Sequence, residues 1–345
     1  MSTHGPLSGT AGEGALLGTP PPPWLQGQMA TLRAAHAAGR FPHALLIHEA
    51  SGAGGEWLAL WAAQLVLCRE AGAPCGGCRE CRRVAALAHP DLTLLGLIEE
   101  SRQIRIEQVR ELSADLALTS HGGGYKVAVL SPADALNRFA ANALLKTLEE
   151  PPPRTLLVLV VSQPSRLPAT VLSRCQRLRI AAPTRSEALA WLAAARGQGD
   201  WNGALDTLGD APFLAAAGDP AELAEVGSDS RATLDALLSG NTDPVAAAER
   251  WARSQVALRL RCFENWLTER IRRAERQGAF LPELLPAPYL PAAGAFLNIR
   301  ELFGLVDAVR DLRATLDIPL NRGLALEAVF RQLAAPERAS TGERR

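Results

Sequence analysis

Short aliphatic runs alternate with helical patterns along the first half of the chain, and this alternation constrains the fold more than any other feature of the sequence. Such runs, bounded by turn residues, are typical of buried strands in a parallel sheet, and the helical patterns between them supply the crossover connections. We therefore predict an α/β domain with a parallel sheet and with ligands at the carboxyl ends of its strands. Strands are expected at residues 44–47, 92–95, 127–130, 156–161 and 177–180.

Helices are predicted from the spacing of apolar residues. Ile106, Val109, Leu112 and Leu116 share one helical face, and a second helix carries Leu136 to Leu148 and ends before the prolines at 151–153. Strand patterns stop after residue 180, and a linker there leads into a helix with Ser186 as a possible N-cap. A small helical domain to about residue 223 and a longer helical region follow, with long helices expected at 244–277, 298–316 and 319–333.

Composition excludes some classes of protein. The chain has 345 residues, of which 36 are basic and 36 acidic, so it has no overall electric field that would attract nucleic acid. It has no apolar run long enough to cross a bilayer and no signal-peptide pattern, which favours a cytoplasmic protein without membrane partners. Residues 1–22 are rich in Gly, Pro, Ser and Thr and are expected to form a disordered tail, as are residues 336–345.

A glycine-rich turn at residues 49–56 has the placement of a phosphate-binding loop, between the first strand and the next helix. Such a loop needs a lysine for the β- and γ-phosphates and a hydroxyl for the metal ion, and here Gly55 and Glu56 hold those two positions. Glu49 and Glu56 also repel a polyphosphate. Strong nucleotide binding is not expected, and the turn, which includes Gly54, is either a degenerate phosphate loop or an ordinary strand-to-helix turn.

The third predicted strand is followed by Ser131 and Pro132, at the place where a nucleotide hydrolase carries a magnesium-binding Asp and a water-activating Glu. Neither residue can perform that chemistry. Ser131 as N-cap and Pro132 at the first helical position would instead start a helix. Asp134 is interpreted as a capping residue of that helix rather than as a displaced metal ligand.

Four of the six cysteines lie within residues 68–81: Cys68, Cys75, Cys78 and Cys81. Two successive C-x-x-C steps predict four thiolates around one structural zinc ion per chain, with no open position for catalysis. The alternative, a redox C-x-x-C pair, would leave two of the cysteines without a role. Neighbouring arginines can offset the negative charge of four thiolates.

Several longer segments together resemble the delta-prime subunits of the bacterial DNA polymerase III clamp loader, a family in the AAA+ clamp-loader superfamily. The matching segments are FPHALLIHE at 41–49, RVAALAHPDL at 83–92, IRIEQVREL at 104–112, NALLKTLEEPPP at 142–153, LSRCQRLRI at 172–180 and, more weakly, LNRGLALEAVFRQLA at 320–334. The resemblance implies a RecA-like AAA+ domain at 23–181 with a zinc module at 68–81, a helical lid at 182–223 and an all-α collar at 224–335 through which subunits associate.

The same resemblance implies a role without hydrolysis. In the Ser-Arg-Cys sequence of this superfamily the arginine is a finger that enters a neighbour's ATP site, which here would be Arg174. From the residues alone, pairing of Arg174 with a local carboxylate is the preferred interpretation. Implied partners are the ATPase gamma/tau subunits and delta in a heteropentamer and, through the complex, the sliding clamp and primer-template DNA.

Two other functions are kept as alternatives: an ATP-hydrolysing clamp-loader subunit, and a zinc-dependent nucleic-acid-binding module. The arginines between Arg250 and Arg273 could form a surface that faces DNA, but acidic residues interleave with them. That mixture is more typical of a solvated helix face or of subunit contacts.

Overall fold

The computed structural model describes residues 14, 16–98, 101–276, 299–316 and 321–334. Their packing groups them into two units, one of residues up to Gly199 with Asp210–Gly218, the other of Asp200–Gly209 with the residues from Asp219 onward. The predicted lid at 182–223 and collar at 224–335 stay predictions. The proline-rich connection at 282–291 and the tail at 336–345 lie outside the described residues.

The first unit is built on a parallel five-stranded sheet in the order β2-β3-β4-β1-β5. The strands are β1 (Ala44–His48), β2 (Leu92–Leu95), β3 (Lys126–Leu130), β4 (Thr155–Val161) and β5 (Gln176–Arg179). All five strand predictions are confirmed to within one residue at each end. The expectation of full burial is wrong for β2 and β5, because each has one neighbour only, and in β5 only Leu178 is buried.

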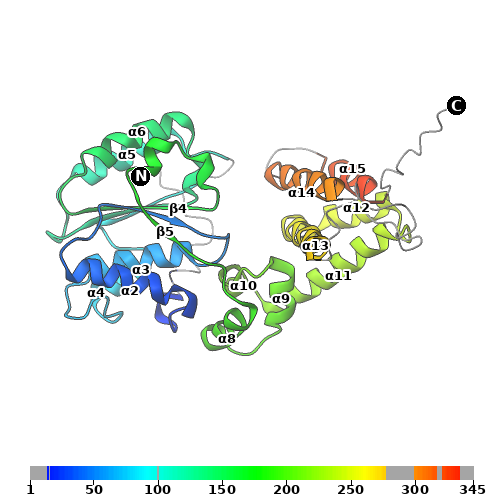
Figure 1. The fold of residues 1–345 in the computed structure, drawn as a ribbon, viewed down its shortest axis with the longest axis horizontal. Helices are drawn as coiled ribbons and strands as arrows, with labels where there is room; N and C mark the ends of the chain where they lie inside the picture. The colour runs from blue at the N-terminus through cyan, green and yellow to red at the C-terminus, as the bar shows by residue number, and fades with distance from the viewer. Residues whose placement is uncertain (1–13, 15, 99–100, 277–298, 317–320, 335–345) are drawn as a thin grey trace. The chain divides into compact units, whose positions relative to one another are not determined.

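Helices cover both faces of this sheet (Figure 1). On one face α5 (Ile106–Ala117), α6 (Arg138–Glu149) and the short α7 (Ala169–Leu172) pack against alternate strand residues such as Leu46 and Leu159. On the other lie α2 (Gln26–Ala37), α3 (Gly55–Leu67) and α4 (Arg79–Ala85), and every residue of α3 is buried. Short 3₁₀ helices occur at Leu16–Gly18, Pro23–Leu25, Ala133–Ala135 and Pro164–Arg166.

The prediction of a disordered tail at residues 1–22 is wrong for the last residues of that range. Leu16 is buried at 3% exposure, and Pro20 accepts a hydrogen bond from the indole of Trp191. Apolar and backbone contacts thus fix this stretch in spite of its composition, whereas residues 1–13 lie outside the described part.

Two further helices complete the first unit: α8 (Arg185–Arg196) and α10 (Pro212–Ala216). The N-cap of α8 is Thr184, which forms a capping box with Glu187, so the prediction of Ser186 as N-cap is wrong. From α10, Phe213 packs against Trp24, Trp57 and Trp191, with the ring centroids of Phe213 and Trp191 4.6 Å apart.

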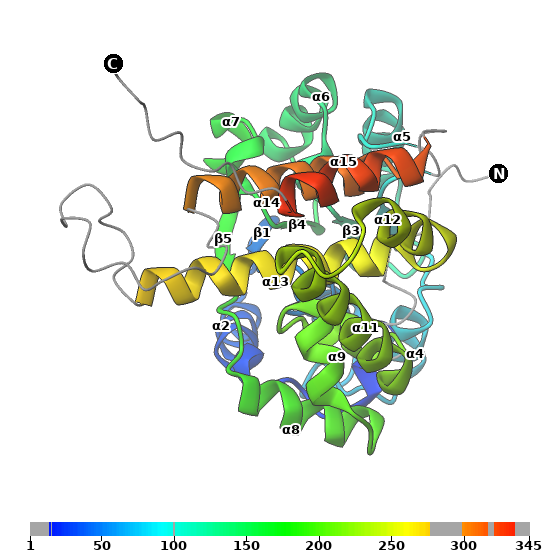
Figure 2. The ribbon, with the colours of Figure 1, turned by 90° about the vertical axis from the view of Figure 1, so that its right-hand side faces the viewer.

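The second unit is helical and contains α9 (Trp201–Leu208), α11 (Pro220–Leu238), α12 (Pro244–Arg253), α13 (Val256–Arg276), α14 (Ile299–Ala314) and α15 (Arg322–Ala334) (Figure 2). Its core includes Trp251, Phe263 and Phe330, each fully buried. The single helix expected at 244–277 is two helices, because the chain breaks at Ser254 and Gln255, where Gln255 adopts a φ of 53°.

Candidate functional site

The glycine-rich turn after β1 is filled by the chain's own carboxylate. Glu49 Oε2 accepts a hydrogen bond of 2.7 Å from the backbone N–H of Gly55, the first residue of α3. A helix N-terminus favours an anion because its first N–H groups lack partners within the helix. The Glu49 carboxylate, only 9% exposed, therefore occupies the place that a phosphate would take in a working loop.

The position of the missing lysine is also closed sterically. A Cβ atom on Gly55 would lie 2.6 Å from Cδ of Glu49 and 2.8 Å from Cγ1 of Val160. At Gly54, with φ 101°, a Cβ would lie 2.3 Å from Cε2 of Phe213. The turn thus packs directly against β4 and α10 with no room for a side chain at either glycine, and sequence patterns gave no sign of the Phe213 contact.

Burial governs the charge of both carboxyl groups in this turn. It raises the pKa of Glu49 to about 7, against the opposing hydrogen bond from Gly55 and with a further upward effect of the Glu56 charge. Burial likewise raises the pKa of Glu56, which a hydrogen bond from Ser131 opposes. The turn thus holds two acidic side chains and, among its residues 49–56, no basic one.

Ser131 does not start a helix. Its hydroxyl donates a hydrogen bond of 2.5 Å to Oε1 of Glu56, joining the end of β3 to the start of α3. The helix expected to begin at Pro132 begins at Arg138, where the side chain of Asn137 accepts from the N–H of Ala140. The predicted cap at Ser131 is therefore wrong: the hydroxyl is used by a residue distant in sequence.

Asp134 is likewise not a cap of the helix that follows it. Its Oδ2 accepts a hydrogen bond of 2.9 Å from the backbone N–H of Gln163, after β4. The carboxylate, 8% exposed, thereby ties together the loops that leave β3 and β4. The capping interpretation of Asp134 is corrected to a loop-to-loop link.

Arg174 lies between α7 and β5 and has a local carboxylate partner. Its Nη2 atom is 2.6 Å from Oε1 of Glu149, and Nη1 donates to the carbonyl of Thr170 at 2.9 Å and to the hydroxyl of Ser173 at 3.3 Å. The Arg174 side chain is 35% exposed and that of Glu149 is 48% exposed. The guanidinium is thus oriented by its surroundings and remains accessible to solvent, with its Nε–H unused among the described residues.

The four cysteines form a compact cluster. The Sγ atoms of Cys68, Cys75, Cys78 and Cys81 all lie within 4.8 Å of one another. The N–H of Cys78 donates to Sγ of Cys75 at 3.3 Å, and the N–H of Cys81 donates to Sγ of Cys78 at 3.4 Å. Zinc with Zn–S bonds of about 2.3 Å places its sulfur ligands roughly 3.8 Å apart, so the donor set is compact enough for one metal ion.

Thiol acidity differs across the cluster. N–H donors from Cys78 and Gly77 lower the pKa of Cys75 to about 7, which favours a thiolate at the exposed end. Burial raises the pKa values of Cys68 and Cys81 above the ordinary thiol value. The cluster can hold a metal ion. Cys175, outside it, is a buried thiol whose pKa is raised to about 11 by burial.

Among the residues that the structure describes, four of the eight arginines of α12 and α13 form ion pairs with acidic residues of their own unit. Arg259 and Arg250 contact Asp229, at 2.5 and 3.8 Å, and Arg270 contacts Asp235 at 2.7 Å while stacking 3.9 Å from the ring centroid of Trp266. These contacts favour the interpretation of a structural, acid-paired helix surface over that of a face for DNA. None of the described helices is both long and apolar enough to span a membrane.

One family model matches the α/β part of the chain. The family model described as "DNA polymerase III, delta subunit" matches residues 25–184. DNA polymerase III subunit delta' of Pseudomonas aeruginosa is 45% identical over 177 residues, covering 50% of this chain and 52% of that protein. The corresponding subunit of Escherichia coli K12 is 38% identical over 172 residues, covering 49% and 52%.

A DNA polymerase III subunit tau, from Salmonella typhimurium, is 33% identical over 146 residues, covering 42% of this chain and 22% of tau. The chain thus spans about half the length of the delta' relatives that it matches. The resemblance noted from the segments between residues 41 and 180 is confirmed, because the family model covers the sheet, the glycine-rich turn and Arg174. The weaker match at 320–334 stays a prediction.

Proposed function

We propose that this protein, whose residues 25–184 match the family model of the DNA polymerase III delta subunit, is a non-hydrolysing subunit of the replicative clamp loader. In this role it completes a heteropentamer with gamma/tau and delta subunits, which loads the sliding clamp onto primed DNA. It supplies Arg174 to the ATP site of a neighbouring subunit. One observation carries the proposal: the Glu49 carboxylate bound to the N–H of Gly55, where a phosphate would bind.

Physical chemistry supports the absence of hydrolysis. A triphosphate would have to displace Glu49 and would find no lysine for its charge. Magnesium would find the Ser131 hydroxyl, already bonded to Glu56, in place of an aspartate. In a site of reduced dielectric, removing a cation and adding a carboxylate both oppose ATP binding. The alternative of an ATP-hydrolysing subunit requires tight binding of magnesium ATP to the isolated chain.

The geometry of Arg174 is compatible with action in trans. An exposed ion pair such as Arg174–Glu149 is worth about 0–1 kcal/mol, so the guanidinium can exchange this carboxylate for a γ-phosphate at low cost. An arginine finger supplied by a neighbour can raise a rate by about a thousandfold or more. We assign the Arg174–Glu149 pair to the state of the chain without its neighbour.

Zinc is proposed as a structural ion, one per chain, held by the four clustered cysteines. Bound there, it would neutralise thiolate charge and cross-link the end of α3 to α4, without a coordination position for substrate. The predicted collar, residues 224–335, is proposed to carry the contacts with other subunits. A zinc-dependent nucleic-acid-binding module is disfavoured by the balanced charge of 36 basic and 36 acidic residues.

The test is reconstitution of the loader with Arg174→Ala. We expect the ring to assemble and DNA-stimulated ATP turnover to fall severalfold, because one of its sites loses the finger. Arg177→Ala is the matched control: Arg177 is an exposed arginine three residues further on whose guanidinium bonds only to the carbonyl of Leu172, at 3.4 Å, among the described residues. Unchanged turnover with Arg174→Ala, or equal losses in the two variants, would remove the finger assignment.

A further inference from the structure

A pocket of about 360 Å³ lies at the edge of the sheet opposite the glycine-rich turn. It is formed where α3 ends, along α4, and in the loops that lead into β2 and β3. Because the strands are parallel, residues that precede β2 and β3 lie at the amino-terminal edge, whereas Glu49 and Gly55 follow the carboxyl end of β1. The pocket is therefore separate from the phosphate loop, although Cys68, one of the four proposed zinc ligands, also lines it.

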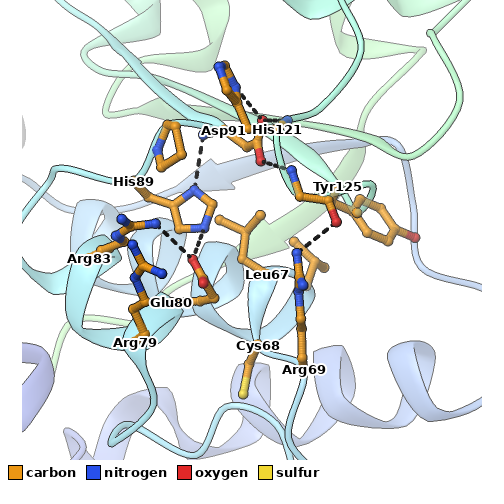
Figure 3. A pocket seen from close by; sticks show the side chains of 14 residues that line it. Leu67, Cys68, Arg69, Arg79, Glu80, Arg83, His89, Asp91, His121 and Tyr125 are labelled. Atoms are coloured by element: carbon orange, nitrogen blue, oxygen red, sulfur yellow. Dashed lines mark hydrogen bonds and ion pairs between the residues drawn. The ribbon is translucent and has the colours of Figure 1, made fainter.

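Three arginines line this pocket: Arg69, Arg79 and Arg83 (Figure 3). Arg79 and Arg83 are four residues apart on α4, a spacing that puts both on one helix face. Figure 3 shows their side chains next to each other, beside Glu80. One carboxylate, that of Glu80, lies against two adjacent guanidinium groups and offsets only part of their mutual repulsion.

The two carboxylates of the pocket are already occupied. The Asp91 side chain, 5% exposed, accepts from the N–H groups of His121 at 2.8 Å and Gly122 at 3.2 Å. The N–H of Asp91 donates to Nδ1 of His89 at 3.0 Å, so Nε2 of His89 carries the proton and lies 3.0 Å from Oε2 of Glu80. Both acids are thus engaged by neutral donors of the chain, and the three arginines of the pocket outnumber its two carboxylates.

The guanidinium groups retain free donors. Arg83 forms one ion pair, of 3.7 Å, with Glu80, and the guanidinium of Arg79 has no hydrogen bond or ion pair within the described part of the chain. Arg69 donates one bond, of 2.7 Å, to the carbonyl of Gly122. A Cβ on Gly122 would lie 2.3 Å from Nη2 of Arg69, so a glycine at 122 is what lets this arginine reach the loop.

We propose that this pocket binds a phosphate monoester dianion, with the phosphate on the guanidinium groups of Arg79 and Arg83 and with Arg69 on the opposite wall. Planar guanidinium forks match phosphate oxygens, and a dianion is attracted to two adjacent guanidinium groups more strongly than the single charge of a phosphodiester is. Tyr125, at the pocket wall, offers a ring for a base. A volume of 360 Å³ is large enough for a nucleotide-sized ligand.

Two sources share this chemistry: a free nucleoside monophosphate and the 5′-phosphate end of a nucleic-acid strand. The full-length protein with its zinc is titrated with thymidine monophosphate, with thymidine, and with a short single strand that carries either a 5′-phosphate or a 5′-hydroxyl. We expect each phosphorylated probe to bind about tenfold or more tightly than its unphosphorylated partner, as charge-assisted bonds require. Preference for the strand or for the mononucleotide identifies the source.

The matched variants are Arg79→Ala with Arg83→Ala, and Arg82→Ala. Arg82 lies on the same helix and next to the same cysteines but does not line the pocket, so its removal tests whether the arginines merely balance thiolate charge. We expect the double variant to lose about tenfold or more in affinity and Arg82→Ala to stay within about twofold. Equal losses, or equal binding of 5′-phosphate and 5′-hydroxyl strands, would overturn the proposal.

A second double variant, Arg79→Lys with Arg83→Lys, controls for misfolding, because it keeps both positive charges. It should bind the phosphorylated probes more weakly than the unaltered protein, since an ammonium group cannot make the two parallel bonds of a guanidinium. If this variant binds as tightly, the guanidinium geometry that we propose is wrong.

Discussion

Replacing Glu49 with glutamine should remove a pH-dependent loss of stability from the α/β unit. Glutamine keeps an oxygen that can accept the hydrogen bond from Gly55 but does not titrate. In the unaltered chain, burial raises the pKa of Glu49 from an ordinary 4.5 to about 7. A carboxyl group with a raised folded-state pKa favours folding at low pH, and this contribution disappears as the pH rises through the folded-state pKa.

The magnitude follows from the size of the shift. At roughly 1.4 kcal/mol for each pKa unit, a rise from 4.5 to about 7 corresponds to about 3 kcal/mol, fully lost above the folded-state value. Of this, about 2 kcal/mol falls between about pH 5.5 and about pH 8, which is a convenient experimental window. Burial also raises the pKa of Glu56, but that effect is present in both proteins and cancels in their difference.

Hydrogen exchange of the β1 amides reports the opening free energy of this unit separately from the helical one. Between the two pH values we expect the unaltered chain to lose about 2 kcal/mol more than Glu49→Gln. Glu150→Gln, which alters an exposed carboxylate at the end of α6, should follow the unaltered chain. Identical pH slopes for the unaltered chain and for the Glu49→Gln variant would refute the buried, proton-linked carboxylate.

Two further predictions concern the turn and the cysteines. Gly54→Ala should destabilise the α/β unit by about 2 kcal/mol or more, because a positive φ and the Phe213 ring both exclude a Cβ, whereas Gly123→Ala, with φ 67° and nothing within 4 Å, should cost only about 1 kcal/mol. Thermal unfolding compares the two variants, and equal losses of stability would contradict the steric exclusion of a Cβ by the Phe213 ring. Cys81→Ser should lower bound zinc from one ion per chain toward none, while Cys175→Ser should leave it unchanged; metal analysis of protein purified under reducing conditions decides.

The strands could be predicted from the sequence because their signal is local. Val127 to Leu130 are apolar without interruption and are buried on both faces, which is what a central parallel strand requires. Strand order is not local, and it decides which strands lie at the edge. The exposed arginines of β5 at 177 and 179 were therefore included in a run that was expected to be buried.

Caps were harder to predict because several polar residues compete for each helix start. Ser131 has the residue type of an N-cap, yet its hydroxyl bonds to Glu56, 75 residues away in sequence, and Asn137 caps the helix instead. The break at Gln255 has no glycine or proline to announce it. Tertiary contacts outweighed local preference in both places.

For the candidate site, too, local features could be predicted from the sequence and contacts between distant segments could not. The missing lysine and acids, and the close spacing of the cysteines, depend only on residue type and were visible at once. The bond from Gly55 to Glu49, the contact of Phe213 with Gly54 and the pairing of Arg174 with Glu149 each join segments that only the folded chain brings together.

The ion pair between Arg174 and Glu149 has a consequence for selectivity. If Arg174 acts in trans as proposed, binding to a neighbour without ATP replaces the contact of Arg174 with Glu149 by contact with water, with no gain in electrostatic energy. Binding to a neighbour that holds ATP replaces that contact by one with a more highly charged anion. Arg174 then leaves the Glu149 carboxylate only for a stronger anion, so the subunit discriminates between ATP-bound and empty neighbours without binding ATP itself.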